Sequence, residues 1–226
     1  MTATVQSVER AFTILETFDE EHPTRSAAEI AELAGLARPT TYRMLQTLQR
    51  LGYVRNVSGR YEVTPRVLRL GAGYLGRTSL AARAQPILDQ LSEDLGEHAA
   101  IGTLDGDDVI TLAASTTPQS RLLSIAIQVG QRMPADSTSL GRILLAYRPN
   151  ADDADSVAIR DAGFVITDGL LESGLRSLGV PVRDRDGAVV ASMSIGVNAS
   201  RISVDDLRDR CLPAMLHAAD VLSQRL

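Results

Sequence analysis

The chain has 226 residues, of which 44% are hydrophobic, so it can form one or two domains with cores of their own. Its net charge of −5 excludes a uniformly basic nucleic-acid-binding protein, and its single cysteine excludes a framework of disulfide bonds. Residues 38–83 nevertheless hold nine arginines and one acidic residue, whereas residues 84–226 hold twelve arginines and twenty acidic residues. This uneven charge predicts a polyanionic partner for the first of these segments only.

Three helices are predicted at the start of the chain. Apolar residues repeat at helical spacing over residues 7–19. Ser26 and Glu29 have the spacing of a capping box for a second helix, which Gly35 ends. A third helix follows over residues 36–48, with a proline in its first turn. The second and third helices together predict a helix–turn–helix.

A short basic hairpin follows these helices. Its predicted strands are residues 54–57 and 60–63, joined by a two-residue turn at residues 58–59. A hairpin in this position is typical of the wing of a winged helix–turn–helix. Beyond it we expect a linker helix over residues 65–83.

The remainder of the chain predicts a mixed, mainly antiparallel sheet with helices around it. The expected strands are residues 99–104, 109–114, 122–129, 164–167, 178–182 and 189–197. The expected helices are residues 79–95, 136–147 and 203–226. The predicted fold class is therefore α+β, with a winged helix–turn–helix domain in residues 1–64, the linker helix in residues 65–83 and a second domain in residues 84–226.

The third helix and the hairpin carry the candidate DNA-binding residues. In a helix–turn–helix the second helix of the motif presents its N-terminal side chains to the major groove. The candidates are Arg38, Thr40, Thr41, Tyr42 and Arg43 on the helix, and Arg55, Asn56, Ser58 and Arg60 on the wing. The alternative is a small helical domain with a solvated basic face. The wing and the segregated charge favour double-stranded DNA as the partner.

Residues 5–66 resemble the winged helix–turn–helix of the IclR family of bacterial transcriptional regulators. The motifs that carry the resemblance are residues 7–15, 38–48 and 51–54, followed in the second half by residues 134–146, 172–184 and 187–195. The chain is most similar to the branch that controls aromatic-acid catabolism, of the protocatechuate and 4-hydroxybenzoate type. Residues 147–161 form a shorter stretch than the family pattern has, through either a true deletion or a loop absent from the sequence.

The resemblance implies a GAF-like effector domain in residues 84–226 that binds a small carboxylate. The pocket residues that it implies are Leu122, Ile125, Ser139, Leu140, Thr167 or Asp168, Leu175, Ser177, Ser194 and Gly196. The chemistry of the residues themselves supports part of this pocket, because small side chains and free amides at the start of the 136–147 helix suit a carboxylate. The alternative is that residues 137–139 only cap this helix. Arg142 and Arg176 could also clamp a carboxylate, but a surface position or a salt bridge is equally compatible with the sequence.

No other motif predicts a catalytic, cofactor or metal site. Residues 71–76 match the dinucleotide fingerprint, but they follow a helix start rather than a strand. His22, His98 and His217 lack metal-ligand spacing, and Cys211 lies in an apolar stretch of the last helix. We also expect a cytoplasmic protein without a membrane segment, because the sequence has neither a leader nor an apolar run of bilayer length.

The sequence therefore predicts a transcriptional regulator, not an enzyme, whose operator binding is controlled by an aromatic acid or another small carboxylate. We expect a homodimer or tetramer with contacts in residues 65–95, on a near-palindromic operator with half-sites ~34 Å apart or a multiple of that. Two alternatives remain open: a dimeric DNA-binding scaffold that senses no ligand, and a small enzyme with a DNA-binding appendage.

Overall fold

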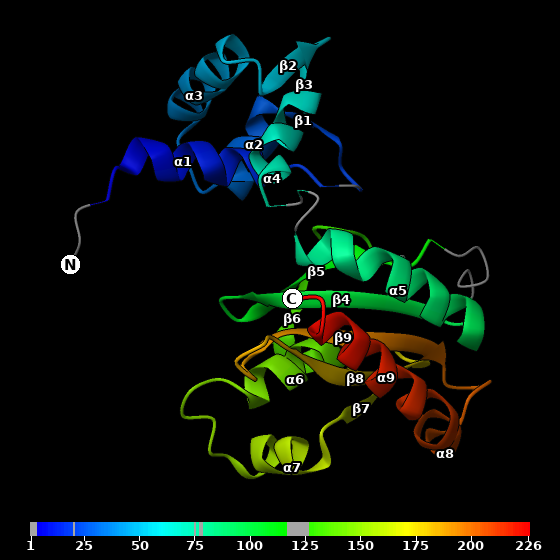
Figure 1. Cartoon of the computed structure of the whole chain (residues 1–226). Coiled ribbons are helices and arrows are strands. Elements are labelled where there is room, and N and C mark those ends of the chain that lie inside the picture. Colours follow the sequence, from blue (N-terminus) through cyan, green and yellow to red (C-terminus); the bar gives the residue numbers. More distant parts are fainter. Residues whose placement is uncertain (1–3, 20, 75, 77–78, 117–126) are drawn as a thin grey trace. The chain divides into compact units, whose positions relative to one another are not determined.

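The computed structural model describes residues 4–19, 21–74, 76, 79–116 and 127–226. It divides into two compact units, Met1–Tyr74 and Leu75–Leu226, each with a hydrophobic core (Figure 1). We call them the N-terminal unit and the C-terminal unit. Within the described ranges, no helix is long and apolar enough to cross a membrane.

The N-terminal unit packs short helices against a three-stranded antiparallel sheet of order β1-β3-β2. Its elements are α1 (Gln6–Leu15), β1 (Thr24–Ser26), α2 (Ala27–Leu33), α3 (Arg38–Arg50), β2 (Val54–Val57), β3 (Arg60–Val63), a 3-10 turn (Pro65–Val67) and α4 (Leu68–Ala72). The buried core residues are Ile14, Ile30, Leu45, Leu48, Val54 and Tyr61. The predicted order of helix, turn, helix and wing is confirmed.

Local hydrogen bonds explain where α2 and the wing turn form. The Ser26 hydroxyl accepts from the Glu29 amide at 3.3 Å, and the Glu29 carboxylate accepts from the Ser26 amide at 2.6 Å. At the tip of the wing, Ser58 and Gly59 have φ angles of 52° and 87°. Positive φ at both positions is the geometry of a type I′ turn, which matches the twist of a two-residue hairpin.

The linker differs from the predicted single helix over residues 65–83. Helix α4 ends at Ala72, and the next helix begins at Leu80 with the Ser79 hydroxyl as its cap. The glycine-rich segment 71–76 lies at this break, and each glycine costs roughly 1 kcal/mol of helix propensity against alanine. Because a helix precedes these glycines, the dinucleotide-binding strand–turn–helix context is absent here.

The C-terminal unit is built around a six-stranded sheet of order β6-β5-β4-β9-β8-β7. Its strands are β4 (His98–Asp105), β5 (Asp108–Ala114), β6 (Arg132–Pro134), β7 (Val165–Asp168), β8 (Leu175–Arg183) and β9 (Val189–Asn198). Its helices are α5 (Leu80–Leu95), α6 (Ser139–Ala146), α7 (Ala154–Ala162), α8 (Val204–Asp206), a π-helical turn (Leu207–Cys211) and α9 (Leu212–Ser223). Each pairing between the described strands is antiparallel, so this sheet is antiparallel throughout rather than mixed.

The two faces of this sheet carry different side chains. Helices α5 and α9 cover one face (Figure 1). On this face, large apolar residues such as Leu178 and Met193 belong to the buried core. On the other face, β4, β8 and β9 present mainly glycine, alanine and hydroxyl side chains beneath α6. Close approach requires the glycine at 179, because a Cβ there would lie 2.6 Å from the Ser139 carbonyl oxygen. The small-residue face is therefore the one on which α6 sits.

Three elements of this unit differ from the predictions. Strand β6 and helix α7 were not predicted: β6 has only three residues, and α7 lies in the stretch that departs from the family pattern, with the Asp153 side chain as its cap. The closing helix is not continuous, since a π-helical turn precedes Pro213, which has no amide to donate to a regular helical bond. Most of the predicted strand over residues 122–129 lies outside the described residues.

Candidate nucleic-acid interface and effector site

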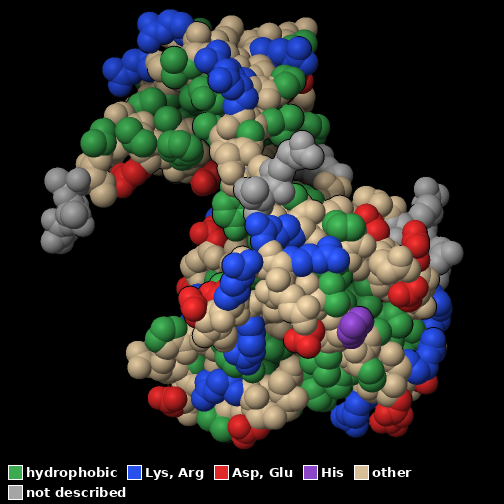
Figure 2. Space-filling view, in the orientation of Figure 1, with side chains coloured by type: hydrophobic (Ala, Val, Ile, Leu, Met, Phe, Trp, Pro, Cys, Tyr) green, Lys and Arg blue, Asp and Glu red, His purple; other side chains and the backbone are tan. Residues whose placement is uncertain are grey.

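The exposed side of α3 carries arginines without carboxylate partners. Arg38, Arg43 and Arg50 are exposed, and none of them forms an ion pair with another described residue. Tyr42 is 51% exposed between them, and Thr40 is half-buried. On the face that Figure 2 shows, arginine side chains gather on the N-terminal unit, whereas side chains of both charges mix on the C-terminal unit. This side of α3 can therefore offer unneutralised positive charge to phosphates or bases.

Thr41 does not belong to this surface. Its side chain is 0% exposed, and its hydroxyl donates to the Ala37 carbonyl oxygen at 3.4 Å. The helical rotation that turns Tyr42 and Arg43 outward turns Thr41 toward the core beside Leu45. The prediction that Thr41 contacts DNA does not fit this burial.

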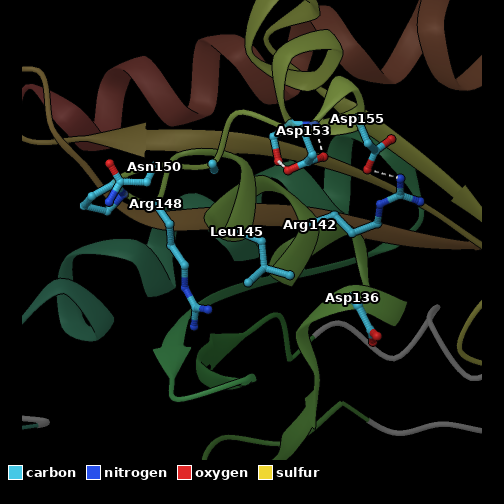
Figure 3. A pocket seen from close by; sticks show the side chains of 10 residues that line it. Asp136, Arg142, Leu145, Arg148, Asn150, Asp153 and Asp155 are labelled. Atoms are coloured by element: carbon cyan, nitrogen blue, oxygen red, sulfur yellow. Dashed lines mark hydrogen bonds and ion pairs between the residues drawn. The ribbon is translucent and has the colours of Figure 1, made fainter.

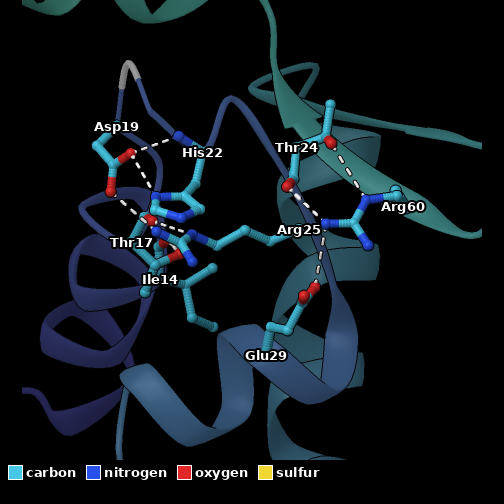
Figure 4. A network of polar contacts seen from close by, with 8 residues as sticks. All are labelled: Ile14, Thr17, Asp19, His22, Thr24, Arg25, Glu29 and Arg60. Carbon is cyan, nitrogen blue, oxygen red and sulfur yellow. Dashed lines mark hydrogen bonds and ion pairs between the residues drawn. The ribbon is translucent and has the colours of Figure 1, made fainter.

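The wing arginines are paired within the N-terminal unit. Arg55 forms an ion pair with Glu62 on the neighbouring strand. Arg60 donates to the Thr24 carbonyl oxygen at 2.9 Å and pairs with Glu29 at 3.2 Å (Figure 4). Arg25 forms an ion pair with Asp19 at 2.8 Å (Figure 4), so Arg25 and Arg60 both bind to the segment between α1 and α2.

The remaining wing candidates lie at the turn. The Asn56 side-chain oxygen accepts from the Gly59 amide at 3.0 Å, and Ser58 is exposed at the tip. This hydrogen bond gives the Asn56 side chain a structural role in the hairpin. Together with the paired arginines, this makes the wing a more neutral surface than its sequence predicts.

In the C-terminal unit, three predicted effector residues lie in one row across the sheet. Thr167 on β7 is opposite Ser177 on β8, and Ser177 is opposite Gly196 on β9. Directly opposed residues point to the same face, and the Thr167 and Ser177 hydroxyls are 2.7 Å apart. Ser194, two residues along β9, lies on this same face opposite Gly179. These are therefore neighbours on the small-residue face.

The first turn of α6 lies next to this row. The Ser139 carbonyl is packed against Gly179, which is two residues along β8 from Ser177. Thr138 caps the helix by accepting from the Gly141 amide at 3.0 Å, so the proposed capping role is met by this residue. The first amides of a helix have no acceptor inside it, and the Thr138 hydroxyl satisfies only that of Gly141, so the other amides at the start of α6 are candidates for binding an anion.

The other predicted effector residues have different surroundings. Leu140 and Leu175 are buried and can supply an apolar wall. Asp168 is exposed and bound to Arg176 at 2.5 Å, and Arg142 is bound to Asp155 at 2.5 Å. Both arginines are thus in salt bridges. The predicted contacts of Leu122 and Ile125 lie outside the described residues.

His98 is a residue that the sequence-based search for a pocket missed. It is the first residue of β4 and lies opposite Gly196, on the face that carries Ser177. Its side chain is 9% exposed, and its Nδ1 atom has no hydrogen-bond partner among the described residues. Burial lowers the pKa of His98, which favours a neutral imidazole. No local pattern could have placed it there, because the pairing of β4 with β9 joins distant segments.

A separate open cavity of about 480 Å³ lies between α6 and α7 (Figure 3). Polar side chains dominate its lining, among them Asp136, Arg142, Arg148, Asn150 and Asp153. Arg148 contacts the Gly106 carbonyl and lies 3.5 Å from Asp107, so the cavity's arginines have partners of their own. None of the predicted effector residues lines this cavity.

A winged helix–turn–helix followed by a sheet domain with a polar site defines the class of ligand-responsive DNA-binding regulators. The family model of the IclR helix-turn-helix domain matches residues 7–58, and the model of the C-terminal domain of bacterial transcriptional regulator IclR matches residues 72–158 and 154–224. The chain belongs to the IclR family of bacterial transcriptional regulators. It is an effector-controlled DNA-binding regulator and not an enzyme.

Individual relatives extend over nearly the whole chain. The Pca regulon regulatory protein of Pseudomonas putida is 36% identical over 244 residues, covering 97% of this chain and 84% of that protein. A solved structure of a transcriptional regulator from Rhodococcus sp. RHA1 is 34% identical, with a TM-score of 0.81 over 99% of this chain and 98% of that one. An IclR homologue from Microbacterium hydrocarbonoxydans, solved with 4-hydroxybenzoate, shares the fold at 23% identity and a TM-score of 0.79, over 97% of this chain and 98% of that one.

The comparisons also locate the departure from the family pattern. The C-terminal family model matches in two segments that meet at residues 154–158. The alignment to the Pseudomonas putida protein extends over 244 positions, although this chain has 226 residues, so that relative carries residues that this sequence lacks. Helix α7 and the cavity beside it lie at this shortened place.

Proposed function

We propose that the chain acts in the cytoplasm as a homodimer or tetramer on a near-palindromic operator, and that an aromatic carboxylic acid bound to the C-terminal unit changes its operator affinity. The effector part rests on one observation: hydroxyls and a glycine share a row of the small-residue face beside the start of α6. The amides of α6 would bind the carboxylate, while Leu140 and Leu175 would contact the ring. The names of two relatives support this class of ligand, since one regulates a Pca regulon and another was solved with 4-hydroxybenzoate.

Exposed apolar side chains of the N-terminal unit support a dimer. Val5, Val8 and Phe12 lie exposed along α1 and the residue before it, and Leu68 and Leu70 are exposed on α4. Covering these side chains with a second copy would remove apolar surface from water. A two-fold dimer would then present two α3 helices to half-sites ~34 Å apart, or a multiple of that, which is why the operator should be near-palindromic.

The DNA part of the proposal is tested with two arginine variants of the full chain. An operator is selected from random DNA by the wild-type chain, and its affinity is measured by gel shift. Arg43→Ala should weaken operator binding at least about tenfold, because Arg43 is exposed and unpaired among the described residues. Arg60→Ala should weaken it less, since Thr24 and Glu29 already hold that side chain. Equal losses of operator affinity in the two variants would contradict the proposal that α3 is the main DNA-contacting element.

The effector part is tested by thermal unfolding of the full chain with 4-hydroxybenzoate, protocatechuate and, as a non-aromatic control, acetate. A ligand at 100 times its dissociation constant stabilises a protein by about 2.7 kcal/mol, which is a readily measured rise in Tm. The aromatic acids should raise Tm and change operator affinity, and acetate should do neither. Ser177→Trp should abolish both responses while leaving operator binding intact. If no acid has an effect, the alternative of a regulator scaffold without a ligand of this class stands.

A further inference from the structure

The row of effector residues continues across the sheet to His98. Thr167, Ser177, Gly196 and His98 are successive opposed residues of β7, β8, β9 and β4. Neighbouring strands are about 4.8 Å apart, so the Cα atoms of Ser177 and His98 are separated by about 10 Å. The residue between them is a glycine and contributes no side chain. The row thus has a hydroxyl pair on one side, an imidazole on the other, and a side-chain-free position in the middle.

The side-chain hydroxyls of this row already have a partner, whereas His98 Nδ1 has none among the described residues. The Thr167 and Ser177 hydroxyls bond to each other at 2.7 Å. His98 Nδ1 is buried and has no partner in the described part of the chain. Buried polar atoms in folded proteins nearly always have a hydrogen-bond partner, so this atom indicates a partner that the described residues do not supply.

Thr111 provides a comparison within the same face. Its hydroxyl is also buried without a partner among the described residues, and it lies opposite Gly102. Thr111 is 0% exposed and lies on the far side of β4 from the row that holds Ser177. His98 differs because it keeps some exposure and shares the row of the predicted effector residues.

We propose that His98 is a ligand-contacting residue of the effector site, and that its imidazole hydrogen-bonds a ring hydroxyl of the aromatic acid whose carboxylate binds at the start of α6. This assignment rests on the proposed function. A neutral imidazole has one donor and one acceptor, which matches a hydroxyl group better than it matches a carboxylate. Burial keeps the pKa of His98 below its ordinary value, in agreement with the neutral form. His98 would then select hydroxylated over unsubstituted aromatic acids.

The test compares 4-hydroxybenzoate with benzoate, which lacks the ring hydroxyl, by isothermal titration calorimetry on the full chain. Wild type should bind 4-hydroxybenzoate more tightly. His98→Leu should lose about tenfold in affinity for 4-hydroxybenzoate and little for benzoate, because one neutral hydrogen bond is removed. His98→Asn places an amide near the former Nδ1 position and should recover part of the preference. Thr111→Val removes the other buried hydroxyl and should leave both affinities unchanged.

Three outcomes separate this proposal from the proposed function. If wild type binds neither acid, the aromatic effector is wrong, and the assignment of His98 fails with it. If wild type prefers 4-hydroxybenzoate and His98→Leu keeps that preference, only the assignment of His98 is overturned. If His98→Leu loses affinity for both acids equally, the residue shapes the site but does not hydrogen-bond the ring hydroxyl, and the assignment is again overturned. Operator binding by each variant verifies that the N-terminal unit is intact.

Discussion

The two faces of the six-stranded sheet differ in the side chains that they bury, one face being apolar and the other small and polar. The face under α5 and α9 carries large apolar side chains, including Leu178, Val180 and Met193, that are fully buried. The face under α6 carries hydroxyls, glycines and, at His98, a buried ring nitrogen without a partner among the described residues. Apolar burial stabilises the fold, whereas unpartnered polar atoms cost stability. This contrast is the reason why we propose the small-residue face, and not the apolar face, as the effector site.

The largest expected effect comes from the apolar face. Leu178→Ala should lower the free energy of unfolding of the C-terminal unit by about 2–5 kcal/mol, because it leaves a cavity at a fully buried position. Urea unfolding followed by circular dichroism measures this loss. Leu178→Met, which conserves volume, is the control and should cost less than about 1.5 kcal/mol. If Leu178→Ala lowers the free energy of unfolding by less than that value, the apolar face does not stabilise the fold more than the small-residue face does.

A smaller effect is expected where α6 touches the other face. Gly179→Ala should cost roughly 1–3 kcal/mol by overpacking, since its Cβ would lie 2.6 Å from the Ser139 carbonyl oxygen. The shift of α6 should also abolish the rise in Tm with 4-hydroxybenzoate. Gly73→Ala, where no atom lies within 4 Å of the added Cβ, is the matched control and should not destabilise the chain. Equal Tm values for the two variants would contradict the close approach of α6.

Removing one hydroxyl from the small-residue face should change binding more than stability. Ser194→Ala should alter the free energy of unfolding by less than about 1 kcal/mol, because the Ser194 hydroxyl makes no hydrogen bond within the described residues. Its affinity for 4-hydroxybenzoate, measured by calorimetry, should fall severalfold. A variant that loses stability but binds the acid normally would reverse the roles of the two faces.

The smallest effect concerns pH. Burial lowers the pKa of His98 from its ordinary 6.5, so below that pH the unfolded chain takes up a proton that the folded chain does not. His98 therefore does not change the free energy of unfolding with pH above pH 6.5, and lowers it as the pH falls below that value. The neighbouring Glu97 acts in the opposite direction, since burial raises its pKa and its ionisation above pH 4.5 opposes folding. The Tm of wild type should therefore fall more steeply below pH 6.5 than that of His98→Asn, and parallel curves would contradict a buried neutral imidazole.

The recognition surface of the N-terminal unit was predicted in part. The exposed positions of Arg38, Tyr42 and Arg43 follow from the helical repeat, which the sequence displays. The burial of Thr41 also follows from that repeat, but only once the helix is rotated correctly against its core. The partners of Arg60 lie on β1 and α2, so the loss of its free charge depends on the folded sheet.

Chemistry within three or four residues could be read from the sequence alone. The sequence determined the Ser26 capping box and the turn at Ser58 and Gly59, because these depend on short spacings. It also determined the family, because the family's motifs occur along nearly the whole chain. Only the tertiary structure decided that His98 lies opposite Gly196 in the row of Ser177. The physical reason is that strand register is set by packing between distant segments, and a shift of one residue would turn His98 to the other face.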